Sequence, residues 1–247
     1  MSWRSRSMSH ARPGTRMKRR LYHLVSVVLL VGGAVANAAD AWGGDVTDGT
    51  AIDLPEPRRT GEVSVEQALA IRRSVRSFEA KPLPLVAVAQ LLWAAQGVSH
   101  VRGLRTAPSA GALYPLEIHL VVGAVEGLAP GVYRYDPTRH RVTPTQTGDR
   151  RAEIARVALA QAWIAEAPLV LAIAAVPART ARKYGERSER YVAMEVGHAA
   201  QNVYLQAVAL GLGTTMVGAF HDDRVARVLD LPAGERPMGL MPIGRPR

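Results

Sequence analysis

The spacing of apolar residues along the chain predicts a mixture of helices and strands. Apolar side chains recur every three to four positions in 84–95, which predicts an amphipathic helix, and 188–210 is the longest helix candidate. The uninterrupted apolar run 169–174 is typical of a strand that is buried on both faces. Further strands are expected at 117–122, 132–135, 214–220 and 238–243, and further helices at 150–164 and 222–229. This mixture, without strict alternation, predicts an α+β layered domain.

The predicted domain spans 64–247, and its first residues are typical of the N-terminus of a helix. Ser64 and Gln67 have the S-x-x-Q spacing of a capping box, in which the two side chains bond free backbone N–H groups of the first turn. The preceding residues, 39–63, are rich in Asp, Gly, Pro and Thr and predict a linker or wrapping arm.

Residues 1–38 have the layout of a signal peptide. Seven cations and no acidic residue accompany an apolar run at 21–35, and Ala36-Asn37-Ala38 is a small-x-small cleavage pattern. The run is shorter than the roughly 18 apolar residues of a membrane span, although an uncleaved anchor is the alternative. We therefore predict an exported protein, periplasmic or secreted, cleaved near Ala38. Arg19-Arg20 resembles a twin-arginine signal, with an ordinary secretory signal as the alternative, and Met17 is an alternative start.

The leader also accounts for most of the positive charge. The whole chain has 31 Lys+Arg, 21 Asp+Glu and a formal net charge of +10, but seven of these cations lie in 1–38. The remainder, 24 cations against 21 anions, is close to neutral, so we predict no nucleic-acid partner. The chain has no cysteine, which excludes disulfides, thiolate metal sites and a cysteine nucleophile.

An arginine cluster follows the first predicted helix. Arg72, Arg73 and Arg76 lie within five residues, together with Ser74, and a continuing helix would place Arg72 and Arg76 on one face. Guanidinium groups bind phosphate bidentately. The segment therefore indicates a phosphate site, with a solvated basic turn as the alternative.

Two segments of small residues could allow the backbone to approach a planar ligand closely. One is Pro108-Ser109-Ala110-Gly111, and the other contains Gly211 and Gly213. Ordinary tight connections are the alternative. No G-x-G-x-x-G follows an early strand, so a Rossmann dinucleotide site is not predicted.

In this order, the three segments resemble the FMN-contacting segments of the nitroreductase superfamily. Lys183-Tyr184-Gly185-Glu186-Arg187 and the E-x-G-H-x-x-Q-N pattern of 195–202 are similar to one branch, the SagB-type dehydrogenases, whose azoline-oxidising members resemble this chain. The resemblance covers about 64–245. It implies a three-layer αβα sandwich with a mixed, mainly antiparallel sheet, and a homodimer with FMN at its interface.

The resemblance also implies a set of FMN-binding residues. The phosphate and ribityl chain would contact Arg72, Arg73 and Ser74, with Arg76 at the phosphate or the ring, and Gly244 and Arg245 closing the phosphate site. The isoalloxazine ring would be bordered by Pro108, Ser109, Ala110 and Gly111 of the partner subunit, by the backbone of Gly211 and Gly213, and by Met216, Val217 and Gly218. Leu113 stands where many nitroreductases place an asparagine, which disfavours classical nitroreduction.

Lys183 and Tyr184 are the predicted catalytic pair. The resemblance implies that such a pair assists substrate deprotonation while FMN accepts a hydride, and a cation beside a phenol favours the phenolate that can act as base. A pair of charged surface residues is the alternative.

The predicted function is therefore that of an exported FMN-dependent oxidoreductase. Its substrate would be a small molecule or a modified peptide, with NAD(P)H as a candidate reductant, although an export signal argues against cytoplasmic azoline substrates. A non-catalytic flavin- or ligand-binding module is the alternative. Glu195 and His198 have the spacing of a metal pair, but no second such motif is visible and no metal is predicted.

Overall fold

A seven-stranded sheet organises residues 49–247, the part of the chain that this computed structural model describes. The predicted signal peptide and cleavage site lie outside the described residues. The strand order is β1-β4-β3-β2-β5-β7-β6, and each pair of neighbouring strands is antiparallel. The strands are β1 (Ile52–Asp53), β2 (Leu116–Val122), β3 (Gly131–Asp136), β4 (Arg141–Thr147), β5 (Leu169–Ala175), β6 (Gly213–Thr214) and β7 (Arg236–Gly244).

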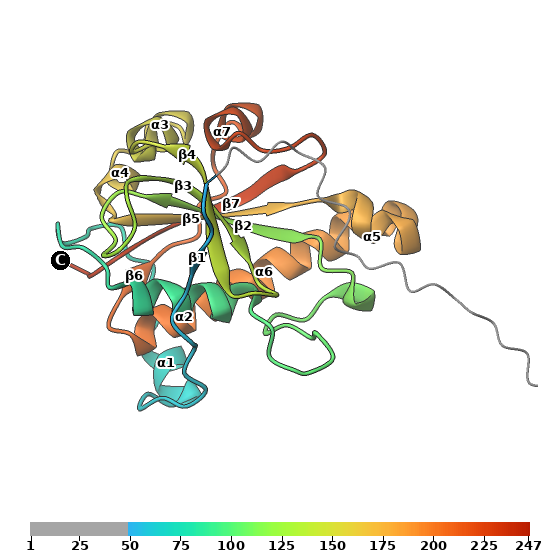
Figure 1. Cartoon of the computed structure of the whole chain (residues 1–247), viewed down its shortest axis with the longest axis horizontal. Helices are drawn as coiled ribbons and strands as arrows, with labels where there is room; N and C mark the ends of the chain where they lie inside the picture. The colour runs from blue at the N-terminus through green and yellow to red at the C-terminus, as the bar shows by residue number, and fades with distance from the viewer. Residues whose placement is uncertain (1–48) are drawn as a thin grey trace, which may run out of the picture. The chain divides into compact units, whose positions relative to one another are not determined.

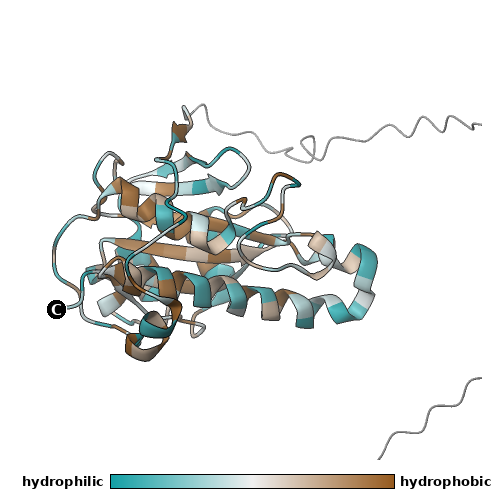
Figure 2. Ribbon diagram, turned by 90° about the horizontal axis from the view of Figure 1, so that it is seen from below, coloured by the Kyte–Doolittle hydropathy of each residue, from teal (hydrophilic) through white to brown (hydrophobic). Residues whose placement is uncertain are grey.

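Helices cover both faces of the sheet and confirm the predicted three-layer α+β sandwich (Figure 1). They are α1 (Val65–Ile71), α2 (Leu85–Gln96), α3 (Arg151–Val157), α4 (Trp163–Glu166), α5 (Pro177–Tyr184), α6 (Ser188–Ala209) and α7 (Asp222–Leu229), with short 3₁₀ turns η2 (Ala110–Ala112) and η3 (Gly185–Arg187). One apolar core lies between the sheet and α2 and α6, and a second lies under α3, α4 and α7. Figure 2 shows the apolar central strands enclosed between helices whose outer faces are polar. Within residues 49–247, no helix is both long and apolar enough to cross a membrane.

The central strands are apolar because they are buried on both faces. Every residue of β2 and of β5 is buried, and the two strands pair along their full length from Leu116↔Ala175 to Val122↔Leu169. This confirms the prediction for 169–174. Two exceptions to the apolar pattern, Glu117 and His119, alternate along β2 and therefore share one face.

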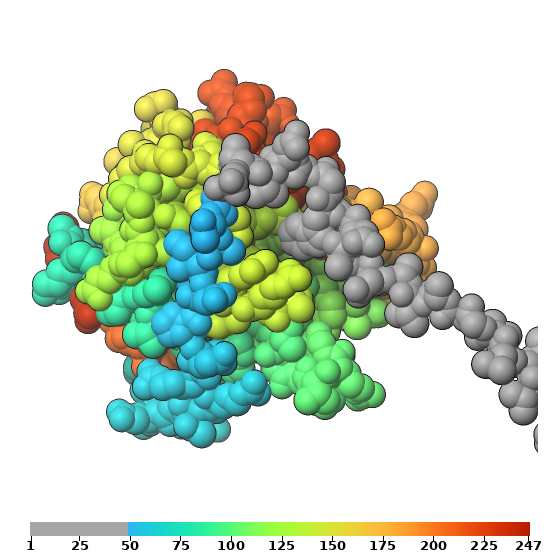
Figure 3. All heavy atoms as spheres, viewed as in Figure 1, coloured from blue at the N-terminus to red at the C-terminus, as the bar shows by residue number. Residues whose placement is uncertain are grey.

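Part of the predicted arm joins the sheet. β1 pairs with β4, Leu54 is buried in the core, and the N–H of Arg58 donates to Oε1 of Gln90 at 2.8 Å. Figure 3 shows this segment lying across the face of the molecule as a narrow strip. The packed unit therefore extends N-terminally of Ser64.

Several predicted elements are wrong in detail, each for a local reason. The helix expected over 150–164 divides into α3 and α4, because Leu159 and Ala160 have φ of 55° and 57°. The strand expected over 214–220 is reduced to β6 and an isolated bridge at Val217. Thr214 pairs instead with the segment after Arg73: it forms a bridge with Ser74, and its carbonyl accepts from the N–H of Val75. β4 was not predicted, since Pro144 interrupts its pattern where the β3–β4 register shifts.

Candidate functional site

The first site segment leaves α1 in an extended conformation. The predicted capping box is present: Ser64 Oγ accepts from the N–H of Gln67 and the Gln67 side chain accepts from the N–H of Ser64. The helix then ends at Ile71, and Arg72 has φ −53° and ψ 125°. The expected helical face shared by Arg72 and Arg76 is therefore wrong. Instead the chain runs beside β6, where Val75 N–H donates to Thr214 O at 3.0 Å.

The arginine segment, the glycine segment and the end of β7 meet at one place. Ser74 forms a parallel bridge with Thr214, Gly213 pairs with Gly244, and the N–H of Glu79 donates to the carbonyl of Arg245 at 2.9 Å. Three regions far apart in the sequence thus come together at one edge of the sheet. They contain the residues predicted at the phosphate, ribityl chain or ring, which are Arg72, Arg73, Ser74, Arg76, Gly244 and Arg245, and the predicted ring neighbours Gly211 and Gly213.

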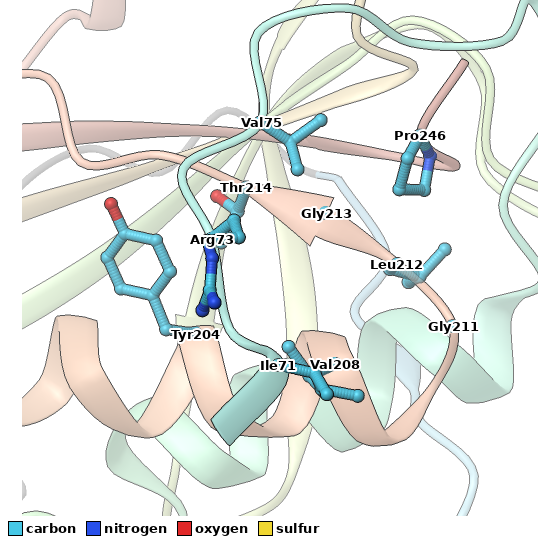
Figure 4. Close-up of a pocket in the computed structure, with 10 residues that line it drawn as sticks. All are labelled: Ile71, Arg73, Val75, Tyr204, Val208, Gly211, Leu212, Gly213, Thr214 and Pro246. Carbon is cyan, nitrogen blue, oxygen red and sulfur yellow. The ribbon is translucent and has the colours of Figure 1, made fainter. Parts of the chain in front are cut away.

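A pocket of about 240 Å³ opens at this edge (Figure 4). Arg73 and Tyr204 lie on one side of it, Gly213 and Thr214 on another, and Pro246 closes the end. Its other lining residues are Ile71, Val75, Val208, Gly211 and Leu212. Cationic, hydroxyl and apolar groups around one hollow fit a ligand that combines a phosphate with a planar apolar ring.

Two polar atoms support that fit to FMN. Thr214 Oγ1 is buried and has no hydrogen-bond partner among residues 49–247, so it is free to bond a ligand in the pocket. The hydroxyl of Tyr204 accepts from the N–H of Met216 at 2.7 Å, and Arg72 lies over its ring at 5.2 Å. Burial alone would raise the pKa of Tyr204, but hydrogen bonds with Ser74, Thr215 and Met216, together with Arg72, lower it.

The structure gives one predicted site glycine a packing role. A Cβ on Gly213 would lie 2.6 Å from Cγ2 of Val75, which real side chains do not tolerate. The glycine therefore lets β6 and the arginine segment pack together. Among the other predicted ring neighbours, Met216 covers the backbone of Gly239, Val217 pairs with Leu240, and Gly218 is exposed.

A second cluster forms around the predicted loop 108–111. Gly111 has φ 63°, and a Cβ there would lie 2.9 Å from the hydroxyl of Tyr184 and 3.1 Å from Nζ of Lys183. The N–H of Ala110 donates to Oε1 of Glu195 at 2.8 Å. The predicted catalytic pair and the predicted ring-bordering loop are thus in contact within one chain. Lys183 is exposed and Tyr184 is half-buried, with its ring edge-on to that of Tyr191.

The carboxyl of Glu195 accepts a hydrogen bond from the backbone of this loop. Its side chain is buried, and burial raises its pKa, an effect that hydrogen bonds from Ala110 and Ser109 and the charges of His198 and Arg105 only partly offset. Within the described part of the chain, no group of three His, Cys, Asp or Glu side chains could hold a metal ion. A buried acceptor for the loop backbone is therefore the role that the geometry gives to Glu195.

This raised pKa predicts that a Glu195→Gln variant gains stability relative to the wild-type chain as pH rises. A carboxyl with a raised pKa in the folded state binds its proton more tightly when folded, so its stabilising effect falls as pH rises from the ordinary value of 4.5 through the raised one. Glutamine keeps an acceptor for Ala110 and does not titrate. We expect the difference in unfolding free energy between variant and wild type to grow in favour of the variant from pH 4.5 upward. Urea unfolding at several pH values measures it, and a pH-independent difference would contradict it.

The two clusters lie at opposite ends of α6. Tyr204 supports the first and Glu195 the second, and their separation of nine positions corresponds to about 14 Å along the helix axis. The loop 108–111 is therefore not brought to the pocket that contains Arg73 within one chain. This separation agrees with the expectation that the loop serves a partner subunit.

Comparison with known proteins decides the family. The family model described as "Nitroreductase family" matches residues 69–245. The chain belongs to the nitroreductase family. A curated relative in Methanocaldococcus jannaschii, itself named as a nitroreductase, is 49% identical over 194 residues, which are 78% of this chain and 96% of that protein. The trifolitoxin operon protein TfxC of Rhizobium leguminosarum bv. trifolii is 25% identical over 74% of this chain, and the match spans 56% of TfxC.

Solved structures agree with this membership of the nitroreductase family. A crystal structure from Ralstonia eutropha, described as a nitroreductase, is 31% identical with a TM-score of 0.69, covering 80% of this chain and 90% of that one. At 22% identity, two others show the shared fold alone. The match to the NADPH:FMN oxidoreductase of Vibrio harveyi has a TM-score of 0.54 and covers 74% of this chain and 68% of that one. The match to the Escherichia coli microcin synthetase McbBCD complex has a TM-score of 0.64 and covers 89% of this chain and 84% of that one.

Sequence reasoning missed several residues of this nitroreductase-family site. Tyr204 and Thr214 carry no motif, since a tyrosine within an amphipathic helix is indistinguishable from a packing residue. Arg247 was also missed, although its N–H donates to the carbonyl of Ser77 and its guanidinium to that of Phe78, at 3.2 and 2.8 Å. A signal did exist for Glu117, because two polar residues two apart in a buried strand predict a polar seam.

Proposed function

We propose that the protein is an FMN-dependent oxidoreductase of the SagB type. The observation that carries this proposal is the meeting of the arginine segment, the glycine segment and the end of β7 at one pocket with an unpaired buried hydroxyl. Membership of the nitroreductase family supports it, as does the shared fold with a protein described as an NADPH:FMN oxidoreductase. FMN, when bound, would supply two-electron chemistry at N5.

The chain's own residues would bind and orient the cofactor. Arg72, Arg73 and Arg245 would hold the phosphate through charge-assisted hydrogen bonds, and Thr214 would donate its free hydroxyl. The loop 108–111 is the predicted contribution of a partner subunit to the ring, and we propose a homodimer for that reason.

Lys183 and Tyr184 would move the proton that accompanies the redox step. Tyr184 lies against Gly111, next to the predicted position of the ring, and Nζ of Lys183 lies 5.5 Å from the Tyr184 ring centroid. The phenol of Tyr184 and the ammonium group of Lys183 are both groups that can exchange a proton with a substrate. A small heterocycle, quinone or modified peptide, with NAD(P)H as a candidate reductant, is the proposed substrate class, and export stays a prediction that rests on residues 1–38.

Spectroscopy of the purified protein tests this proposal. We expect flavin absorbance bands and FMN on acid release, or saturable binding of added FMN, followed by turnover of NADPH with menadione as acceptor. Tyr184→Phe should lower turnover at unchanged FMN affinity. A protein that binds FMN without turnover would favour the non-catalytic module. One that does not bind FMN would refute the oxidoreductase and leave a module that binds another ligand.

A further inference from the structure

One guanidinium joins three elements beneath the Lys183–Tyr184 pair. Arg179 lies on α5, four residues before Lys183, on the same side of the helix. Its Nη2 lies 2.6 Å from Oε1 of Glu117 at the start of β2, and its Nη1 donates to the carbonyl of Tyr114 at 3.0 Å. Arg179 therefore connects the helix of the catalytic pair, the sheet and the end of the 108–114 loop.

The acceptor for this guanidinium is itself fixed. The Glu117 side chain is only 6% exposed, and its second oxygen lies 3.0 Å from Nη2 of Arg134. Arg134 is 3.7 Å from Glu235, whose other oxygen lies 2.5 Å from Nε2 of His119. The ion pair of Arg179 thus continues through Arg134 and the buried Glu235 to the buried His119. An isolated ion pair on the surface would instead be mobile and screened by solvent.

The loop that Arg179 bonds has a backbone that needs such support. Ala112 and Tyr114 have φ of 53° and 46°, a region that is unfavourable for non-glycine residues unless surrounding contacts impose it. Three contacts act at Tyr114 besides Arg179. Its N–H donates to Oγ of Ser109 at 2.9 Å, its hydroxyl accepts from the N–H of Arg105 at 3.3 Å, and the Arg105 guanidinium lies over its ring at 4.5 Å. Arg179 is the contact that also reaches the helix of the catalytic pair.

We propose that Arg179, held by Glu117, is a positioning residue for Lys183 and Tyr184. This inference rests on the proposed function. By bonding Tyr114 and Glu117 at once, the guanidinium sets the distance between α5 and the loop, and so places the phenol of Tyr184 against Gly111 and the reacting atoms beyond it. Lysine cannot replace it, because an ammonium group lacks the planar fork that bonds two acceptors in fixed directions.

A double-mutant cycle on the FMN-loaded enzyme tests this role. The variants are Arg179→Lys, Tyr184→Phe and the two combined, with Arg182→Lys as the matched control, since Arg182 lies on the same helix, is exposed and has no described role in the site. Turnover of NADPH with menadione gives kcat and KM, and fluorescence titration gives the FMN Kd. Glu117→Gln, alone and with Tyr184→Phe, provides a second variant that keeps an acceptor while removing its charge.

The proposal predicts a specific pattern of rates. Arg179→Lys should lower kcat by about 10-fold or more, with KM and the FMN Kd within about twofold of wild type, because a positioning residue acts on the reacting geometry. In the Tyr184→Phe background the same change should alter kcat by less than about twofold, since contacts that act through one group are not additive. Glu117→Gln should follow the same pattern, and Arg182→Lys should match wild type.

Other patterns overturn the proposal. Arg179→Lys could match Arg182→Lys, or could lower kcat equally with and without the Tyr184 hydroxyl; either result removes the positioning role. Loss of FMN binding in both Arg179→Lys and Glu117→Gln would show that the pair only maintains the fold. A wild-type protein that does not bind FMN refutes the proposed function itself, and a Tyr184→Phe enzyme with wild-type kcat refutes the role of the catalytic pair. Each of these failures is visible in a different variant.

Discussion

Replacing Glu235 by alanine should lower the free energy of unfolding by about 3–5 kcal/mol. The His119 and Glu235 side chains are 3% and 2% exposed and lie 2.5 Å apart, with Arg134 3.7 Å from the second carboxylate oxygen. Removing the carboxylate would leave Nε2 of the buried His119 without the partner that compensates its lost hydration, whereas Arg134 would keep its contact with Glu117. The cost therefore comes mainly from the group left behind.

A surface ion pair next to this one provides the control. Glu189 lies 2.6 Å from Arg236, but the side chains are 62% and 52% exposed. Glu189→Ala should therefore cost less than about 1 kcal/mol. Chemical denaturation of both variants at one pH measures the difference, and equal losses would contradict the compensating role of Glu235.

Replacing Arg72 by glutamine should weaken FMN binding by about 10- to 100-fold, the effect of losing one hydrogen bond to a charged group. Arg72 is half-buried, it packs on Tyr204, and it precedes the segment that pairs with β6. Its guanidinium is therefore held at the pocket edge before any ligand binds, and little side-chain entropy is lost on binding.

Two comparisons separate a phosphate contact from a general loss of structure. Riboflavin lacks the phosphate, so its affinity should be the same in Arg72→Gln and wild type. Arg224→Gln, which removes an exposed arginine on α7, should change neither affinity. Fluorescence titration measures all of these values, and a parallel loss of riboflavin affinity would show that Arg72 acts through folding or through the ring.

Much of the fold could be predicted because periodicity reports burial directly. The longest helix was predicted to within one residue at its C-terminus, and the buried strand β5 was recognised from its apolar run. Backbone features that depend on φ were not predictable, since neither Leu159 nor Ala160 is a residue type that signals a left-handed conformation. The cap of α7 is another such feature. His221 is its N-cap without a side-chain hydrogen bond, and Asp222 and Asp223 lie in the first turn, where they complement the helix dipole.

The candidate site could be predicted where short motifs carry it and not where single residues do. The arginine segment, the two small-residue segments and Lys183-Tyr184 were all found, and the structure places them in two clusters. Arg179 was not found, because its partners Glu117 and Tyr114 are more than 60 residues away in the sequence. Only the antiparallel pairing of β2 and β5 brings these residues together.

The length of α6 between Glu195 and Tyr204 has an evolutionary consequence. Each inserted or deleted residue in a helix rotates everything beyond it by about 100° and shifts it by about 1.5 Å. A single insertion here would turn one cluster away from its loop while leaving the other in place. We therefore expect natural length variation in this family to occur in surface connections such as 99–104. The eight residues between Glu195 and Tyr204 should vary in type but not in number.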